Sequence, residues 1–349
     1  MREGGYFSDA DRELTQAIGL INSHDDFPLV IAKRRSDGIY DSLRTYWLPR
    51  FRAGGIRAVV GAVYTPSIYL PEAALRHAMR VIDALYEELG DNQDDVVLAR
   101  SAADIQRINN AGRIAVLLAV EGAEPLGHDL GTLRLFHRLG LRMLSFTWHR
   151  RTAFGDGAWE NGSRGGLTRL GHQAVKEMNR LGIIIDVSHA SDQTTWDILE
   201  ASTKPVIASH SNARALRDHP RNLTDEMIRA IASSDGIVAV TAVARFITEG
   251  TPTIGDWADH LAHIIRVADI DHVGIGADFA DYLIEIGASP EIVDWSPDIG
   301  VRRTKFEGML SPEDLPGLTR ELVRRGFAER ELRKIYHENY LRVFSSILG

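Results

Sequence analysis

The sequence contains no cysteine in its 349 residues. Disulfide bonds, thiolate zinc sites and a cysteine nucleophile are therefore excluded. Any metal site that this chain forms must take its ligands from histidine, aspartate and glutamate. The chain has 13 histidines from which such a site could be built.

An excess of positive charge is also missing. The chain carries 40 Lys and Arg against 48 Asp and Glu, a net charge of −8, so it offers no general attraction to nucleic acid or anionic lipid. No apolar run approaches the ~18 residues of a membrane helix, and the first 16 residues carry charges where a signal peptide has its apolar core. We therefore expect a cytoplasmic protein that has neither nucleic acid nor a membrane as partner.

Short apolar runs rich in β-branched residues alternate with amphipathic segments along the chain. The runs predict eight buried strands, at residues 19–22, 55–64, 114–120, 141–147, 182–187, 205–208, 237–243 and 272–276. The segments between them have the helical period, at residues 71–89, 102–110, 131–139, 167–181, 192–201, 224–233 and 257–267. Parallel strands need crossover helices, so this alternation predicts a single α/β domain, residues 1–349, folded as a (β/α)8 TIM-type barrel.

Two segments fall outside this alternation. Residues 281–312 are long and punctuated by Pro and Gly, and we expect them to be an insertion after the eighth strand that could form a lid. Residues 311–348 have a helical pattern. We expect this tail to pack on the outside of the barrel.

Polar residues directly follow the predicted strands, at the end where a β/α barrel builds its active site. His24 and Asp26 are two residues apart after the first strand, so an extended backbone places both side chains on one face. The other strand ends supply Glu121, His189, His210 and Asp278. One histidine at a strand end is more often structural, but the joint occurrence of all six residues favours a common site.

Three histidines and three carboxylates at one end of a barrel would bury like-charged acids together, at a heavy desolvation cost. Divalent cations remove this cost. Imidazole and carboxylate ligands without thiolate suit Zn²⁺, with Mn²⁺, Co²⁺ or Fe²⁺ as substitutes. Two ions ~3.5–4 Å apart, bridged by one carboxylate, are a common device for hydrolysing amides and esters. We therefore expect a site for divalent cations, of the kind that serves hydrolysis when two ions are bound.

Several motifs occur in an order and spacing that is characteristic of one family. They are SHDDFP at 23–28, AVEGA at 119–123, GLT at 166–168, EMNRLG at 177–182, DVSH at 186–189, SHS at 209–211, RNL at 221–223 and GIGADF at 274–279. On these residues the sequence resembles the membrane (renal) dipeptidase family of the amidohydrolase superfamily. The resemblance extends from about Ile21 to Phe344.

The resemblance implies a role for each matching residue. His24 and Asp26 would bind the first zinc ion, Glu121 would bridge both ions, and His189 and His210 would bind the second. Asp278 would be the general acid/base that moves a proton from water to the leaving amine. Arg221 would hold the C-terminal carboxylate of the substrate, with Asn222 as a further contact. The implied activity is hydrolysis of dipeptides with a free C-terminal carboxylate, with a D-residue tolerated there. Independently of the resemblance, we expect a homodimer, the commonest assembly of soluble chains.

The sequence departs from the family pattern in three places. The family histidine after the fourth strand aligns with Trp148, which puts oxyanion stabilisation and substrate range in question. His149, the next residue, is a candidate catalytic replacement. Trp148 itself is a candidate substrate contact. After the Asp-Phe pair, where the family usually has an acidic residue, this chain has Ala280. The animal enzymes are secreted, lipid-anchored and disulfide-linked, and this chain lacks the cysteines for that linkage. Many bacterial relatives resemble the Thr-Trp version, so we expect activity to be retained.

Other interpretations of these residues remain open at this stage. Arg221 lies in a charged cluster that on composition alone would be a solvated turn, and His149 could be a loop residue paired with Asp156. Asp25 is expected to support its neighbours, and structural roles are expected for His128, His172, His219 and His272. Two other functions also remain: a related amidohydrolase that acts on N-acyl amino acids, lactones or phosphoesters, and a non-catalytic metal-bound scaffold.

Overall fold

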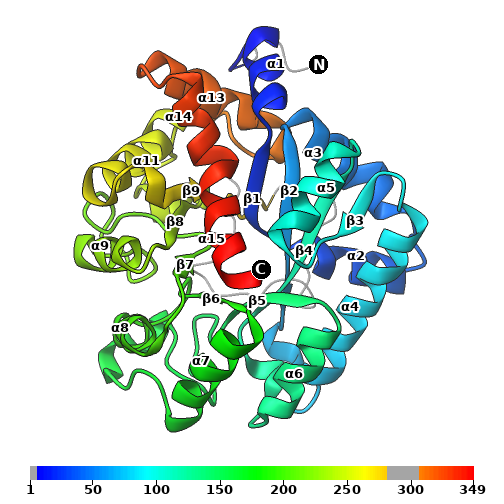
Figure 1. Cartoon of the computed structure of the whole chain (residues 1–349), viewed down its shortest axis with the longest axis vertical. Helices are drawn as coiled ribbons and strands as arrows, with labels where there is room; N and C mark the ends of the chain where they lie inside the picture. Colours follow the sequence, from blue (N-terminus) through cyan, green and yellow to red (C-terminus); the bar gives the residue numbers. More distant parts are fainter. Residues whose placement is uncertain (1–5, 281–305) are drawn as a thin grey trace.

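Parallel strands close into a barrel that helices surround (Figure 1). The computed structural model describes residues 6–280 and 306–349. Within this part of the chain the barrel consists of eight strands, β1 Leu20–Asp25, β2 Ile56–Tyr64, β4 Ile114–Glu121, β5 Leu141–Ser145, β6 Ile184–Asp186, β7 Val206–Ala208, β8 Ile237–Val240 and β9 Val273–Ile275. The ring closes because β1 pairs with both β2 and β9, and β2 pairs with β4. The predicted TIM-type barrel is confirmed.

Each of the eight predicted strands is present, with ends that differ by a few residues. A further strand, β3 Val96–Leu98, was not predicted. It pairs in parallel with the first half of β4, whereas β5 pairs with β4 only from Leu118 onward. The strand is only partly buried, unlike the equally short strands β6, β7 and β9 of the ring. β3 therefore adds an edge to the sheet without entering the ring.

The predicted helices are also present, and several start at a residue whose side chain caps the first turn. Thr224 accepts a hydrogen bond from the Met227 amide at the start of α9. The same role falls to Ser101, Thr168, Ser191 and Thr253. These helices are α4 Ala74–Asp91, α5 Ala102–Asn110, α6 Leu130–Arg138, α7 Arg169–Leu181, α8 Asp192–Ala201, α9 Asp225–Ser233 and α11 Ile254–Ala268.

Four α-helices among the described residues were not predicted. They are α1 Asp9–Ile18, α2 Phe27–Ser36, α3 Leu48–Ala53 and α10 Ala244–Ile247. The first half of α2 is buried on every side, from Phe27 to Ile31, so it lacks the amphipathic period on which the prediction depended. The helix begins directly after β1, with Pro28 in its first turn, where the missing amide hydrogen costs nothing. This placement sets Asp26 at the junction of β1 and α2.

The C-terminal tail is helical as predicted, in α13 Leu315–Arg324, α14 Glu329–Arg333 and α15 Asn339–Leu348. Its last helix, α15, lies across one end of the barrel (Figure 1). The Tyr340 hydroxyl lies 2.9 Å from Ser23 Oγ and donates to the Ile275 carbonyl at 2.8 Å. Apolar side chains of α15 share a core with residues of the barrel interior, and this packing closes the barrel. Most of the predicted insertion at 281–312 lies outside the described residues.

The contact between α15 and β9 gives a first testable prediction. A methyl group added at Gly274 would lie 2.5 Å from Tyr340 Cζ, and such overpacking costs about 1–3 kcal/mol. We therefore expect Gly274→Ala to lower the free energy of unfolding, measured by chemical denaturation. Gly90→Ala is the matched control, because that helical, exposed position has open space around it and should be neutral or slightly stabilised. Equal stability of Gly274→Ala and the wild type would contradict this account.

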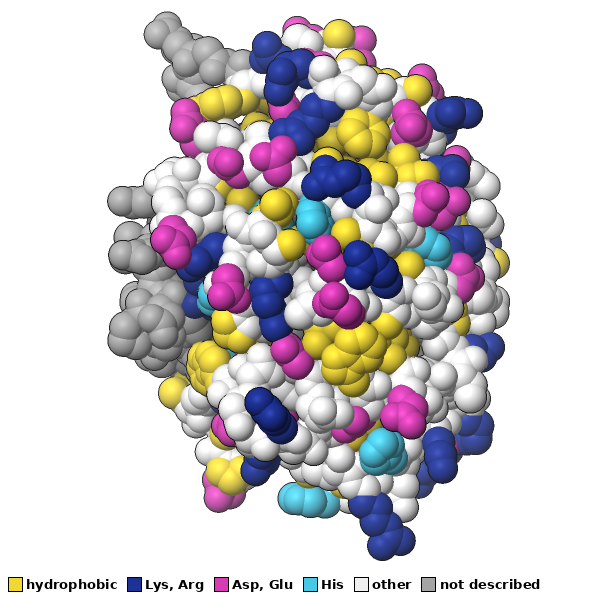
Figure 2. Space-filling model, turned by 90° about the vertical axis from the view of Figure 1, so that its left-hand side faces the viewer, with side chains coloured by type: hydrophobic (Ala, Val, Ile, Leu, Met, Phe, Trp, Pro, Cys, Tyr) yellow, Lys and Arg dark blue, Asp and Glu magenta, His cyan; other side chains and the backbone are white. Residues whose placement is uncertain are grey.

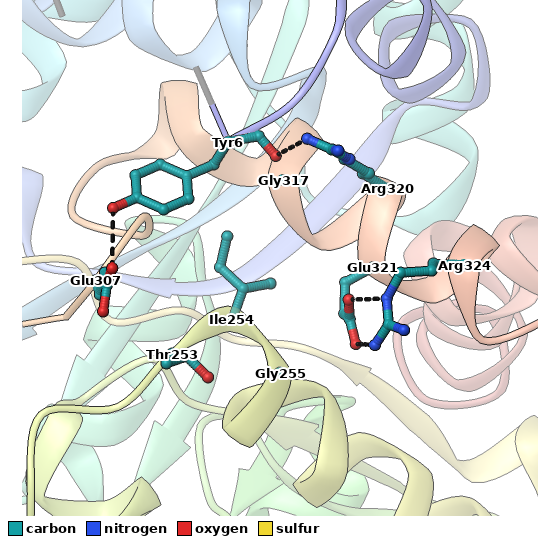
Figure 3. A pocket seen from close by; sticks show the side chains of 9 residues that line it. All are labelled: Tyr6, Thr253, Ile254, Gly255, Glu307, Gly317, Arg320, Glu321 and Arg324. Carbon is teal, nitrogen blue, oxygen red and sulfur yellow. Dashed lines mark hydrogen bonds and ion pairs between the residues drawn. The ribbon is translucent and has the colours of Figure 1, made fainter. Parts of the chain in front are cut away.

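A hollow of about 290 Å³ lies between the start of the chain, α11 and α13 (Figure 3). There the Tyr6 hydroxyl donates to Glu307 Oε1 at 3.3 Å, and Arg320 donates to the Tyr6 carbonyl at 3.0 Å. Glu321 pairs with Arg324 on the same helix. These contacts join the first described residues to the C-terminal helices, and none of the candidate site residues lines the hollow.

The surface carries charges of both signs in close mixture. On the side formed by α8, α9 and α11, acidic and basic side chains are interspersed, and no patch of basic side chains dominates this face (Figure 2). Among the residues described, no helix combines the length and the hydropathy that crossing a bilayer requires.

Candidate active site

Six of the predicted site residues meet at the carboxyl end of the barrel strands. His24 belongs to β1 and Asp26 follows it, Glu121 is the last residue of β4, and the others follow β6, β7 and β9. All six are at most 7% exposed: His24, Asp26, Glu121, His189, His210 and Asp278. Charged and imidazole groups are rarely buried together without a shared partner. The barrel therefore brings together the residues that the sequence placed at its strand ends.

The Glu121 carboxylate lies at the centre of the cluster. Its Oε1 atom is 2.9 Å from His189 Nε2, 3.3 Å from His210 Nε2 and 3.5 Å from His24 Nε2. His24 Nε2 also lies 3.6 Å from Asp26 Oδ1. Each histidine thus points the same ring nitrogen at one carboxylate oxygen. Glu121 Oε1 is thus the common neighbour of the three imidazole rings.

Two overlapping groups of side chains have the spacing of metal ligands. His24, Glu121 and His210 form one group, and His24, Asp26 and Asp278 form the other, with the ligand atoms of each group within 4.8 Å of one another. His24 belongs to both groups, so the two lie side by side. Asp278 is therefore part of the same cluster of side chains.

The backbone conformation near Asp278 and His189 is unusual. Asp278 has φ of 54° and His189 has φ of 72°, a left-handed region that non-glycine residues seldom adopt and that clusters at functional sites. The Ala277 amide, next to Asp278, donates to Asn22 Oδ1 at 2.9 Å. A hydrogen bond from β1 thus fixes the turn that carries Asp278 into the centre.

The chemistry of the cluster fits divalent cations. His189 Nε2 and His210 Nε2 are 2.8 Å apart, so their lone pairs repel unless a proton or a cation lies between them. The converging donors are imidazole nitrogens and carboxylate oxygens, which suit Zn²⁺ and its first-row neighbours. The residues present therefore fit a metal centre.

Electrostatics lead to the same conclusion. Burial raises the pKa of Glu121 to about 8, although His24 opposes this. Burial would lower the pKa of His24, but Glu121 and the neighbouring aspartates outweigh it and raise that pKa to about 10. Burial, with a further contribution from Arg221, holds the pKa of His189 well below its usual value. A buried cluster of acids with these shifts is stabilised by added positive charge.

Asp186 and Ser209 support His210, and sequence reasoning assigned neither a role. Ser209 Oγ lies 2.7 Å from His210 Nδ1 and donates to Asp186 Oδ2 at 2.5 Å. Asp186 Oδ1 in turn accepts the amides of Ser188 and Ser209, both at 2.9 Å. Such partners fix the ring orientation of a metal-binding histidine. The signal was present, because Ser209 directly precedes His210 in the SHS motif and Asp186 opens the DVSH motif that ends in His189.

Arg221 is buried beside His210 and does not belong to a solvated turn. Its Nη2 donates to the His210 carbonyl at 3.0 Å and its Nη1 to Ser211 Oγ at 3.2 Å. The ring of Phe246 lies 5.3 Å from its guanidinium carbon, a distance typical of a cation–π contact. The guanidinium is thus held at the edge of the centre. The interpretation from composition alone, a surface turn, was wrong.

Asn222 is placed differently from its neighbour. Its amide nitrogen donates to the backbone carbonyls of Arg217 and Phe246, both at 2.9 Å. These bonds tie the Arg221 loop to the segment after β8. His219, predicted as structural, accepts the Arg221 amide at Nδ1 at 3.1 Å. Contact between Asn222 and substrate stays a prediction.

Trp148 and His149 both lie buried against His189. The ring centroids of Trp148 and His189 are 5.8 Å apart, and His149 Nδ1 is 3.2 Å from His189 Nδ1. The alternative pairing of His149 with Asp156 does not occur, because that carboxylate accepts from Arg151 and Ser163. His149 thus lies on the loop after β5, and its ring contacts His189 in the site.

The remaining expectations concern residues with structural roles. Asp25 Oδ1 accepts the Phe27 amide at 3.0 Å, which helps to start α2. His272 Nδ1 lies 2.8 Å from the Gly236 carbonyl, just before β9 begins. Ala280, which replaces the family acid, is buried. His272 lies at the opposite end of its strand from Asp278, as predicted.

A parallel β/α barrel with buried histidines and carboxylates converging at the carboxyl ends of its strands defines a metal-dependent hydrolase of the amidohydrolase type. Residues 9–348 match the family model described as membrane dipeptidase, peptidase family M19. The chain belongs to this family of metallo-dipeptidases.

Individual relatives agree with this assignment. The chain is 29% identical to dipeptidase verJ of Clonostachys rogersoniana, over 96% of this chain and 86% of that protein. An amidohydrolase of Pseudomonas aeruginosa has a similar structure, with a TM-score of 0.81, 27% identity, and coverage of 97% of this chain and 99% of the other. A metallopeptidase of Rhodobacter sphaeroides was solved with a phosphinate mimic of the dipeptide L-Ala-D-Ala. Its structure matches with a TM-score of 0.82 and 27% sequence identity, over 94% of this chain and 99% of that one.

Proposed function

We propose that this chain is a binuclear zinc dipeptidase that hydrolyses dipeptides with a free C-terminal carboxylate and accepts a D-residue at that end. The observation that carries the proposal is the buried Arg221 guanidinium, which is held next to His210 at the edge of the candidate metal centre. The phosphinate mimic of L-Ala-D-Ala in the Rhodobacter sphaeroides relative supports the substrate class.

The metal ligands in this proposal are those that converge on Glu121. His24 and Asp26 would hold one ion, His189 and His210 the other, and Glu121 would bridge the two. When bound, such ions neutralise the buried acids and lower the pKa of a water molecule, which makes it a nucleophile near neutral pH. Imidazole and carboxylate ligands suit zinc, with Mn²⁺, Co²⁺ or Fe²⁺ as substitutes.

Asp278 has the position of a proton carrier. It lies with His24 and Asp26 in one group of ligand-spaced atoms, on a turn that Asn22 fixes. A carboxylate there can take a proton from the attacking water and pass it to the nitrogen of the leaving amine. The bond that breaks is the amide bond of the dipeptide, and the products are two free amino acids.

Arg221 would bind the C-terminal carboxylate. Its guanidinium is held by Ser211 and the His210 carbonyl, with the ring of Phe246 packed near it. A guanidinium that is fixed before the substrate arrives loses little entropy on binding, and its fork matches the geometry of a carboxylate. Peptides blocked or extended at the C-terminus would lack this contact.

The proposal is tested by a substrate screen with the zinc-loaded protein. The screen would compare a library of L-Xaa-L-Xaa and L-Xaa-D-Xaa dipeptides with N-acyl amino acids, lactones and phosphoesters. We expect turnover of dipeptides, with D-residues tolerated at the C-terminal position. Faster turnover of N-acyl amino acids or lactones would instead assign the chain to a related amidohydrolase activity, and the absence of any turnover would favour a metal-bound scaffold.

Arg221→Met should raise KM for dipeptides much more than it lowers kcat. The change removes a charge-assisted contact worth about 1.5–3 kcal/mol, which corresponds to a loss of about 10- to 100-fold in kcat/KM. Steady-state kinetics and metal analysis would be measured together, because Arg221 also contacts the His210 carbonyl. Arg217→Met is the matched control, since that nearby guanidinium pairs with Glu249. An unchanged KM would remove the carboxylate clamp from the proposal.

A further inference from the structure

The two ring nitrogens of His189 face different partners. Nε2 points into the candidate metal centre, 2.9 Å from Glu121 Oε1 and 2.8 Å from His210 Nε2. Nδ1 points away from it and lies 3.2 Å from His149 Nδ1. Both histidines are buried, His149 at 2% exposure and His189 at 5%. His149 therefore contacts the outer side of a ligand candidate.

The chemistry of imidazole fixes the proton on each ring. A neutral imidazole has one N–H group and one lone pair, and a metal ligand must present its lone pair to the ion. If His189 binds through Nε2, its Nδ1 carries the hydrogen and needs an acceptor. The atom within reach is His149 Nδ1, which can accept only when the hydrogen of that ring is on Nε2. Carboxylates and backbone carbonyls usually fill this outer position.

The backbone holds the two rings in this relation. The His149 carbonyl accepts the Trp159 amide at 2.9 Å, and the His189 carbonyl accepts the Ala158 amide at 2.8 Å. Consecutive residues of one loop thus bind both histidines. A side chain at Gly157 would collide with the His149 carbonyl, so glycine permits this close approach.

Aromatic rings complete the setting of His149. Its ring centroid lies 4.2 Å from that of Trp148 and 4.8 Å from that of Trp159. Packing on these rings restricts rotation of the imidazole, so His149 Nδ1 stays directed at His189. This arrangement also argues against direct catalysis by His149. The ring of His189 lies between His149, on its Nδ1 side, and Glu121, on its Nε2 side.

We propose that His149 is a positioning residue that accepts the Nδ1–H of His189 and so holds that ring in the tautomer and orientation that present Nε2 to the metal. The inference rests on the metal centre of the proposed function and assigns the outer partner of one ligand in it. His149 then replaces the carboxylate or carbonyl that usually orients a metal-binding histidine. Trp148 and Trp159 serve as the walls that keep the acceptor in place.

The test compares two substitutions that differ in one property. Asn at position 149 keeps a polar atom close to the place of Nδ1, whereas Leu has a similar shape without an acceptor. The affinity of the full-length protein for Zn²⁺ would be measured by chelator competition, together with the visible spectrum of the Co²⁺-loaded protein. We expect His149→Leu to weaken binding of one of the two ions by about 10- to 100-fold and to change the spectrum. His149→Asn should keep most of the wild-type zinc affinity and a spectrum close to that of the wild type.

A control and a second measurement keep the result interpretable. His260→Leu removes an equally buried histidine that bonds to the Ala213 amide, and it should leave the zinc affinity unchanged. In ¹⁵N NMR of the zinc-loaded wild type, His189 should carry its hydrogen on Nδ1. Wild-type affinity in His149→Leu, equally weak binding by both variants, or an Nε2–H tautomer of His189 would overturn the inference. Failure of the wild type to bind zinc at all would overturn the proposed function as well.

Discussion

Glu121→Gln is expected to remove the bound metal and to abolish dipeptide hydrolysis. The Glu121 Oε1 atom lies within 2.9–3.5 Å of the Nε2 atoms of three histidines, so its charge is shared by both halves of the proposed centre. Glutamine keeps the shape but loses the negative charge and one acceptor oxygen. Breaking the shared ligand should therefore affect both ions, whereas His210→Ala should chiefly weaken one.

Metal content by elemental analysis, measured beside activity, tests this prediction. Glu88→Gln is the matched control, because Glu88 is also fully buried but accepts the Leu43 amide away from the site. That variant should keep its metal and its activity, although its stability could fall. Equal metal loss from Glu121→Gln and His210→Ala would contradict a bridging role.

Asp278→Asn should lower kcat by about 10²–10⁴, the usual contribution of general acid–base catalysis, with metal content unchanged. Asparagine keeps the size of the side chain and tolerates the left-handed backbone at φ of 54°, so the turn should persist. What it loses is the ability to accept a proton from water and return it to the amine. KM should change much less than kcat.

Asp235→Asn is the control for backbone effects. Asp235 also has positive φ, at 65°, but it is exposed and pairs with Arg342. Its replacement should leave kinetics and metal content unaltered. Near-full kcat in Asp278→Asn would mean that another group carries the proton. Loss of metal from this variant would show Asp278 to be a ligand, in keeping with its spacing to His24 and Asp26.

The barrel and the cluster at its carboxyl end could be predicted because both leave local signals. Buried parallel strands appear as continuous apolar runs. A His or Glu at the carboxyl end of such a run lies at the end of the barrel where active sites form. Hence His24, Glu121 and His210 were placed correctly at strand ends before any contact was known. Parallel order then required those ends to meet on one side of the ring.

Other features depend on contacts between distant residues. The burial of Arg221 follows from its bonds to the His210 carbonyl and Ser211, which a charged local sequence conceals. The position of α15 across the barrel is set by packing of Tyr340 against Gly274, residues far apart in the chain. The contact between His149 and His189 likewise required the loop after β5 to fold against the residues after β6. Periodicity and composition carry no information on such pairings.

Hydrolysis by this protein is proposed to require both bound metal and a free C-terminal carboxylate on the substrate. The decisive experiment titrates the metal-depleted, full-length protein with Zn²⁺ while hydrolysis of one dipeptide and of its C-terminal amide is followed. We expect no activity without metal, activity that saturates at about two ions per chain, and strong preference for the free dipeptide. Undiminished hydrolysis by the metal-depleted protein, or equal turnover of the amide, would contradict the proposal.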